Sequence, residues 1–88
     1  MIEVVVKVIN QAGIHTRPAA NIVKAAAKFK SEIFLVRDGY SVNAKSIIGV
    51  MTLTAEQDAE LLLRAEGPDE QKAVNSIIEL FEDGFGEL

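Results

Sequence analysis

The stretch EIFLVRDGYSVNA, residues 32–44, predicts a β-hairpin and so decides what kind of sheet the chain can build. Two short apolar runs flank Asp38 and Gly39, and an Asp-Gly pair between such runs is the strongest short-range hairpin signal. A two-residue hairpin joins strands that are neighbours and antiparallel. The middle of the chain therefore predicts two adjacent antiparallel strands.

On the N-terminal side of the hairpin, the sequence predicts one strand and one helix. Residues 2–8, IEVVVKV, alternate in polarity and are rich in β-branched residues, which is typical of a half-buried strand. Residues 17–30 change to the three- and four-residue spacing of an amphipathic helix, and lysines near its end suit the negative end of the helix dipole. The apolar stripe of this predicted helix consists of Ala19, Ile22, Val23, Ala26 and Phe29.

On the C-terminal side, a short helix, a strand and a longer helix are predicted. Ser46 precedes an apolar run as an N-cap precedes a short helix, and residues 60–66 alternate as a strand does. Residues 67–70, GPDE, indicate a helix start with the proline in the first turn, and two later glycines help to end that helix. Its apolar stripe consists of Ala73, Val74, Ile77, Ile78 and Phe81.

The predicted order is strand, helix, strand, strand, short helix, strand, helix, or βαββαβα. An antiparallel sheet of four strands with the three helices on one face is the economical α+β arrangement for these elements. Because 88 residues suffice for one hydrophobic core but not for two, residues 1–88 are expected to form a single domain.

Composition excludes several classes of protein. Hydrophobic residues make up 49% and charged residues 25%, as in ordinary globular chains, and the absence of cysteine excludes disulfides and thiolate metal sites. A net charge of −4 argues against a nucleic-acid partner, which requires clustered Lys and Arg. No apolar run is long enough for a transmembrane helix, and the N-terminus lacks the features of a signal peptide. We therefore expect a cytoplasmic protein that does not insert into membranes.

The only histidine, His15, lies in the segment AGIHTRPAA, where a helix is predicted to begin. Pro18 must fall in the first turn of this helix, because proline lacks the N–H group that an interior position donates. His15 is thereby placed at the N-terminus. The first N–H groups of a helix have no partners within it, and the dipole is positive there. Together these features favour binding of an anion.

This position suits a histidine that carries a phosphoryl group. The positive helix end disfavours the imidazolium form, which leaves a neutral ring with a nucleophilic nitrogen. Once the ring is phosphorylated, the free N–H groups of the first turn and the guanidinium of Arg17 can bind the phosphoryl oxygens. Gly13 is expected to let the preceding loop turn and to leave room for the active site of a partner.

Two motifs in combination resemble a known family. The segments GIHTRPAA at residues 13–20 and NAKSIIGVM at residues 43–51, with AEGPDEQKAV at residues 65–74, resemble the HPr family of phosphocarriers in the bacterial phosphoenolpyruvate:sugar phosphotransferase system. The resemblance extends over nearly the whole chain. It implies the fold of an open-faced β-sandwich.

The resemblance also implies a function. His15 would accept a phosphoryl group at Nδ1 from phospho-enzyme I and pass it to the IIA domains of sugar transporters, assisted by Arg17. A protein of this kind needs no metal or cofactor of its own. It is a protein substrate of phosphotransferases and not itself an enzyme.

Ser46 has two expected roles that can coexist. As an N-cap it contributes about 1 kcal/mol to a short helix. The resemblance further implies phosphorylation of this serine by HPr kinase/phosphorylase, after which the protein serves a catabolite control protein as corepressor. A phosphate adds roughly −1.5 to −2 charges and is tolerated at a helix N-terminus, so the main effect is expected on docking.

Apolar residues beside Ser46 are candidates for partner contact. A helix of one and a half turns cannot bury Ile47, Ile48 and Met51 together, so at least one should face outward. The resemblance implies that this surface contacts enzyme I, IIA domains and regulators. The chain also departs from the family pattern, because family members usually carry glycines near Thr54 and Asp58, in the turn before the fourth strand. Threonine adopts left-handed backbone angles poorly, so this loop is expected to be shaped differently.

Two other functions fit parts of the pattern. The order of elements also suits a ferredoxin-like module, whose members bind RNA or small ligands. The RNA-binding forms need surface aromatics on the sheet and a basic field, and five aromatic residues and a net charge of −4 argue against them. The closer alternative is an HPr paralogue of a nitrogen-regulatory branch, or one that is purely regulatory. The presence of His15 favours a carrier, because purely regulatory relatives lack that histidine.

Overall fold

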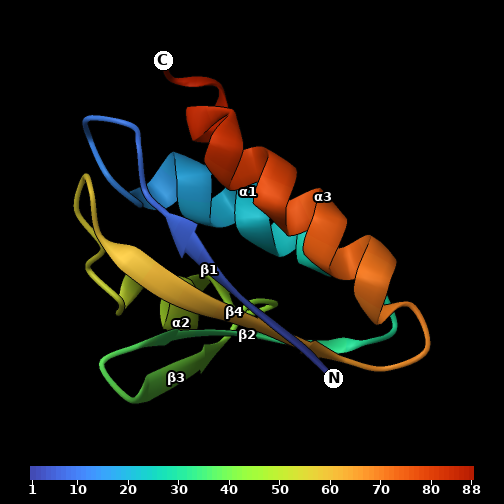
Figure 1. Cartoon of the computed structure of the whole chain (residues 1–88). Helices are drawn as coiled ribbons and strands as arrows, with labels where there is room; N and C mark the ends of the chain where they lie inside the picture. Colours follow the sequence, from blue (N-terminus) through green and yellow to red (C-terminus); the bar gives the residue numbers. More distant parts are fainter.

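The computed structural model describes residues 1–88 and confirms the predicted order of elements (Figure 1). The elements are β1 (Ile2–Lys7), α1 (Thr16–Ala26), β2 (Glu32–Arg37), β3 (Tyr40–Asn43), α2 (Ile47–Met51), β4 (Glu60–Glu66) and α3 (Glu70–Glu82), followed by a 3₁₀ turn at Gly84–Gly86.

The four strands form one open sheet in the order β1-β4-β2-β3, and every neighbouring pair is antiparallel. The predicted hairpin joins β2 to β3, with Arg37 opposite Tyr40. Its two turn residues, Asp38 and Gly39, have φ angles of 49° and 82°. Left-handed angles at both positions match the twist of the flanking strands, which explains why Asp-Gly specifies this turn.

One face of the sheet carries the core. Leu63 in β4 lies opposite Val4 of β1 and Leu35 of β2. The core-facing side chains of β4 therefore pack between apolar side chains of the two neighbouring strands. Residues 60–66 form β4 as predicted, with alternate residues buried beneath the helices. In Figure 1, α1 and α3 lie side by side across this face, and α2 packs against α1 and β3. The predicted α+β open-faced β-sandwich with its helices on one face is confirmed.

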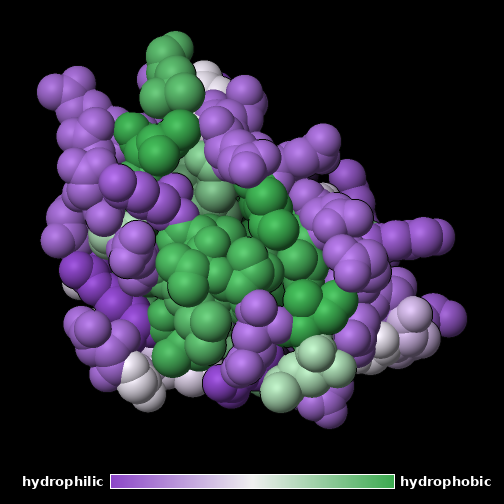
Figure 2. Space-filling model, in the orientation of Figure 1, coloured by the Kyte–Doolittle hydropathy of each residue, from purple (hydrophilic) through white to green (hydrophobic).

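The other face of the sheet has no helix over it. Val5, Leu62 and Val36 lie opposite one another on β1, β4 and β2, and the Val5 side chain is 61% exposed. Figure 2 shows apolar side chains gathered over β1 and β4 within a polar surround.

The first helix is shorter than predicted. Residues 17–30 were expected to be helical, but α1 ends at Ala26, and the N–H of Phe29 donates to the Ala26 carbonyl in a tighter turn. Phe29 continues the apolar stripe because it still packs against the core, which is why the pattern extends beyond the helix. Of the lysines expected near the C-terminal end, only Lys24 lies in the last turn.

The start of α3 also differs from the prediction. Pro68 lies before the N-cap residue, Asp69, and so outside the first turn. The Asp69 carboxylate does not cap the helix but accepts hydrogen bonds from the Ser31 hydroxyl at 2.5 Å and from the N–H groups of Lys30 and Ser31 at 2.9 Å. These bonds lower the pKa of Asp69 from 3.8 to about 2, and the bond from the Ser31 hydroxyl has the largest effect. Asp69 therefore ties the start of α3 to the start of β2.

Candidate functional site

His15 is the N-cap residue of α1, as the position of Pro18 predicts. Its backbone is extended, with φ −97° and ψ −164°, and its carbonyl accepts the first helical hydrogen bond from the Ala19 N–H at 3.0 Å. Pro18 is buried in the first turn, where no N–H group is required. The imidazole is 45% exposed, so a second protein can reach it.

Two backbone donors are free at this helix end. The His15 N–H donates to the Gly13 carbonyl at 3.1 Å, and Pro18 has no N–H group. The N–H groups of Thr16 and Arg17 remain, since the first turn of a helix offers them no carbonyl. The Arg17 side chain is exposed and forms no hydrogen bond or ion pair within the chain, so its charge is available to an incoming anion.

The loop before His15 is held against a distant segment. The N–H of Ile14 donates to the Ala55 carbonyl at 2.8 Å, and Gly13 has a φ of 74°. A Cβ on Gly13 would meet the Ala55 carbonyl oxygen at 2.5 Å. Glycine is therefore required here for a close contact within the chain and for its left-handed backbone, so its need does not depend on a partner.

The sequence does not predict the partner of the imidazole. The Nε2 atom of His15 lies 2.9 Å from Oε2 and 3.2 Å from Oε1 of Glu87, a residue 72 positions away. The Asn10 amide donates to Glu87 Oε1 at 2.9 Å and to the Gly13 carbonyl at 2.8 Å. Asn10 is fully buried, so the carboxylate is fixed to the loop that carries the histidine. No local pattern in the C-terminal segment indicates this contact.

Ser46 is the N-cap residue of α2, as predicted. Its exposed hydroxyl accepts a hydrogen bond from the Gly49 N–H at 3.1 Å. The apolar residues that follow are exposed, Ile48 by 74% and both Ile47 and Met51 by 39%. The expectation that at least one of these residues faces outward is confirmed, and in fact all three do, while their contact with partners stays a prediction.

The loop before β4 keeps left-handed angles although it lacks the usual glycines. Thr54 and Asp58 have φ angles of 46° and 73°. Both residues therefore have the left-handed backbone that glycine favours, and the expected difference in loop shape stays a prediction. The Thr54 carbonyl accepts a hydrogen bond from the Arg37 guanidinium at 3.2 Å, which helps to hold the threonine in this conformation.

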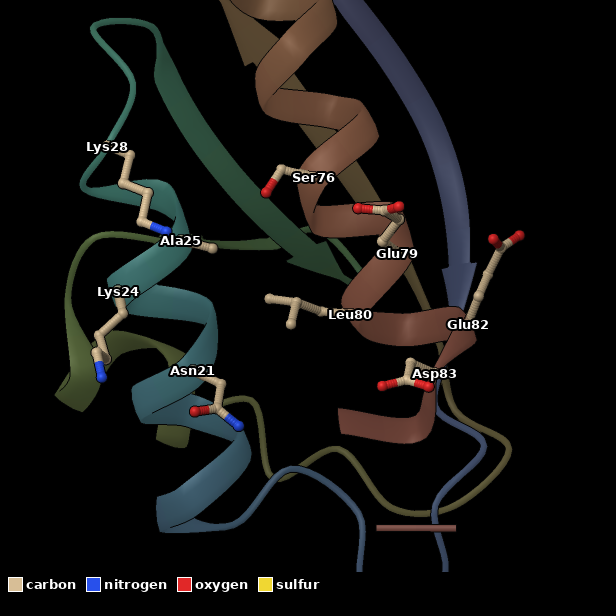
Figure 3. Close-up of a pocket in the computed structure, with 9 residues that line it drawn as sticks. All are labelled: Asn21, Lys24, Ala25, Lys28, Ser76, Glu79, Leu80, Glu82 and Asp83. Atoms are coloured by element: carbon tan, nitrogen blue, oxygen red, sulfur yellow. The ribbon is translucent and has the colours of Figure 1, made fainter. Parts of the chain in front are cut away.

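A polar groove lies along the junction of α1 and α3, and none of the predicted site residues lines it. Figure 3 shows Lys24 and Lys28 on one wall and Glu79, Glu82 and Asp83 on the other. The structure brings no three potential metal ligands together. A membrane span requires a long, continuously apolar helix, and the structure contains none.

Comparisons with known proteins agree with this geometry. A family model described as "PTS HPr component phosphorylation site" matches residues 2–83. The chain is 53% identical to phosphocarrier protein HPr of Treponema pallidum (strain Nichols) over 99% of both chains. Its structure matches HPr-C-His of Thermoanaerobacter tengcongensis with a TM-score of 0.96 and 44% identity, over 100% of this chain and 99% of the other. It also matches the catabolite repression protein Crh of Bacillus subtilis, described as a swapped dimer, with a TM-score of 0.77 and 39% identity over 96% and 97%.

Proposed function

The chain belongs to the HPr family of phosphocarriers in the phosphotransferase system, and from this premise we propose that His15 is the residue that carries the phosphoryl group. Phospho-enzyme I would donate the group to Nδ1 of His15, and a IIA domain of a sugar transporter would then accept it. Residues 1–88 act as one cytoplasmic carrier domain. The partner proteins supply the catalysis, and the chain serves as their substrate.

One observation carries this proposal above all others: an exposed imidazole at the N-cap of α1 with two unpaired N–H groups beside it. A phosphoryl group on the ring would lie next to those donors, which bind anions with the help of the helix dipole. Arg17 adds a cation with no competing partner in the chain. Each hydrogen bond to a charged group contributes about 1.5 to 3 kcal/mol, enough to orient the group and still allow its transfer.

The proposal is tested by incubating the protein with phosphoenolpyruvate and purified enzyme I. We expect one phosphoryl group per chain, labile in acid and stable in alkali, and none in a His15→Ala variant. A purified IIA domain should then remove the group. A wild-type chain that takes up no phosphate, or a His15→Ala variant that takes it up equally, would contradict the proposal.

We propose a second, regulatory site at Ser46. The hydroxyl is exposed, and it lies at a helix N-terminus beside three exposed apolar side chains. A phosphate there places charge next to a surface suited to docking. ATP and HPr kinase/phosphorylase should produce an acid-stable phosphoserine that binds a catabolite control protein and is absent from Ser46→Ala. Failure of the wild type to incorporate phosphate would leave Ser46 with capping alone.

The similarity to Crh supports an alternative function. A purely regulatory paralogue, or a member of a nitrogen-regulatory branch, would share this fold. The exposed His15 favours the carrier of the sugar branch. Comparing phosphoryl transfer from enzyme I of the sugar branch with that from its nitrogen-branch counterpart distinguishes these functions, since the cognate enzyme should be preferred by at least about tenfold, or about 1.4 kcal/mol.

A further inference from the structure

The C-terminal segment places a carboxylate on the imidazole. Both Glu87 oxygens lie within 3.2 Å of His15 Nε2, and the Glu87 side chain is only 17% exposed. We infer that Glu87 is a positioning residue for phosphoryl transfer, which holds the proton on Nε2, directs Nδ1 to the phosphorus atom and stabilises the charge that the ring gains. This inference rests on the proposed carrier function of His15.

The tail that supplies Glu87 is packed and not loosely attached. Phe85 is buried and meets the Phe81 ring edge-to-face, with ring centres 4.9 Å apart. Gly84 has a φ of 59°, and a Cβ there would lie 2.5 Å from the Leu88 side chain. The chain thus folds back at the end of α3. This turn brings residue 87 to the N-terminal end of α1.

Asn10 fixes the carboxylate at the other end. Its amide nitrogen has two hydrogens, and they donate to the Gly13 carbonyl and to Glu87 Oε1. The Asn10 oxygen is buried without a partner, so the orientation of the amide is set by these two acceptors. Because Asn10 and Gly13 belong to the loop that leads into His15, carboxylate and imidazole are held by the same segment.

The contact assigns a role to each ring nitrogen. An ionised carboxylate can only accept hydrogen bonds, so the nitrogen that faces Glu87 must carry a proton. In the neutral ring that proton is on Nε2, and Nδ1 keeps its lone pair. A buried carboxylate fixes the tautomer of the histidine in the same way in serine proteases.

During transfer, the Nδ1 lone pair forms the new N–P bond while the bond between the phosphorus and the donor atom of phospho-enzyme I breaks. The electrons of the broken bond stay on that donor atom. Because Nε2 keeps its proton, the His15 ring gains positive charge as the new bond forms. The Glu87 carboxylate faces that charge directly, so its interaction is stronger in the transition state than in the unphosphorylated protein, as rate acceleration requires.

The test combines two measurements on the full chain. Long-range ¹H–¹⁵N spectra of the wild type at a pH where the ring is neutral should show the proton on Nε2. Quenched-flow experiments then measure phosphoryl transfer from phospho-enzyme I, with kcat and KM given for enzyme I acting on this chain as its substrate. Glu87→Gln should lower kcat by about tenfold or more, while KM changes less than twofold. The reason is that the amide still accepts the hydrogen bond from Nε2 but lacks the negative charge. Glu87→Ala should lower kcat further and broaden the tautomer distribution.

Glu82→Gln is the matched control, because it removes one carboxylate from the exposed end of α3 without a contact to His15. Its kcat should equal that of the wild type. Two results would overturn the inference. One is a proton on Nδ1 in the wild type, and the other is a kcat for Glu87→Gln within twofold of that for the wild type or for Glu82→Gln. If the wild type accepted no phosphoryl group at all, the proposed function itself would fail, and the spectra would still report the tautomer.

Discussion

The Ser31 hydroxyl donates to Oδ1 of Asp69 at 2.5 Å, across 38 residues of sequence. This bond and those from the N–H groups of Lys30 and Ser31 join the turn before β2 to the start of α3. A hydroxyl and two N–H groups around one carboxylate favour its ionised form, so the bond links the stability of the fold to pH.

The first prediction concerns acid stability. The hydrogen bonds hold the pKa of Asp69 at about 2 in the folded protein, against 3.8 in an unperturbed carboxyl. The folded pKa is the lower one, so the stabilisation is complete above about pH 5 and is lost progressively as pH falls through 3.8 and then through 2. Asp69→Asn should reduce the loss of stability over this interval, measured by urea denaturation at several pH values. Ser31→Ala should raise the pKa of Asp69, and an unchanged pKa in that variant would contradict the assigned cause.

Local signals predicted most of the fold. The Asp-Gly turn, the alternation of residues 60–66 and the proline near His15 each act within a few residues, so their consequences can be derived from the sequence. The N-cap roles of His15 and Ser46 follow from the same local rules. Helix ends are less well determined, because an apolar stripe continues through any turn that still packs against the core, as at Phe29.

Contacts between distant segments could not be predicted in this way. Glu87 reaches His15, and Asp69 reaches Ser31, only because the helices return across the sheet and bring these residues together. An acidic residue in a tail or a loop carries no signal of its own, since most such residues are solvated. The sequence therefore predicted that His15 lies at the N-terminus of a helix. It did not predict that the Glu87 carboxylate contacts the imidazole.

The second prediction concerns Gly13. Gly13→Ala places a methyl group where the Ala55 carbonyl oxygen lies and forces alanine into a left-handed conformation. We expect a loss of about 2 to 4 kcal/mol in the free energy of unfolding, measured by chemical denaturation. Gly39→Ala is the control, because Gly39 has a φ of 82° but no atom within 4 Å of its Cβ position. It should lose about 1 kcal/mol, and equal losses in the two variants would contradict the role of the clash.

The third prediction is a stabilising change at Thr54. A β-branched residue at a φ of 46° is strained, and glycine removes that strain at a smaller cost in backbone entropy. Thr54→Gly should stabilise the protein by about 1 kcal/mol and raise Tm by about 4 to 8 °C. The same change at Thr52, where φ is −68°, relieves no strain and should lower Tm. A lower Tm for Thr54→Gly would show that this backbone is not strained.

The fourth prediction separates docking from folding at Ile48. Its side chain is 74% exposed, so Ile48→Gln should change the free energy of unfolding by less than about 0.5 kcal/mol. If this surface contacts enzyme I, the same variant should raise KM for phosphoryl transfer by about tenfold, because it removes one apolar contact from the centre of the interface. Val50→Ala, which truncates a fully buried neighbour, should do the opposite and lower stability more than it changes KM. An unchanged KM in Ile48→Gln would exclude this residue from the contact.

The fifth prediction concerns the two roles of Ser46. Ser46→Ala removes the acceptor of the Gly49 N–H and should lower stability by about 1 kcal/mol. Ser46→Asp keeps an acceptor at the N-cap and adds negative charge that the helix dipole favours, so stability should stay close to that of the wild type. The charge lies beside the exposed residues of α2, and it should slow phosphoryl transfer from enzyme I, while Ser46→Ala should not. If Ser46→Ala also slowed transfer, the effect would come from loss of the cap and not from the added charge. If transfer rates were equal in all three proteins, Ser46 would have no part in docking to enzyme I.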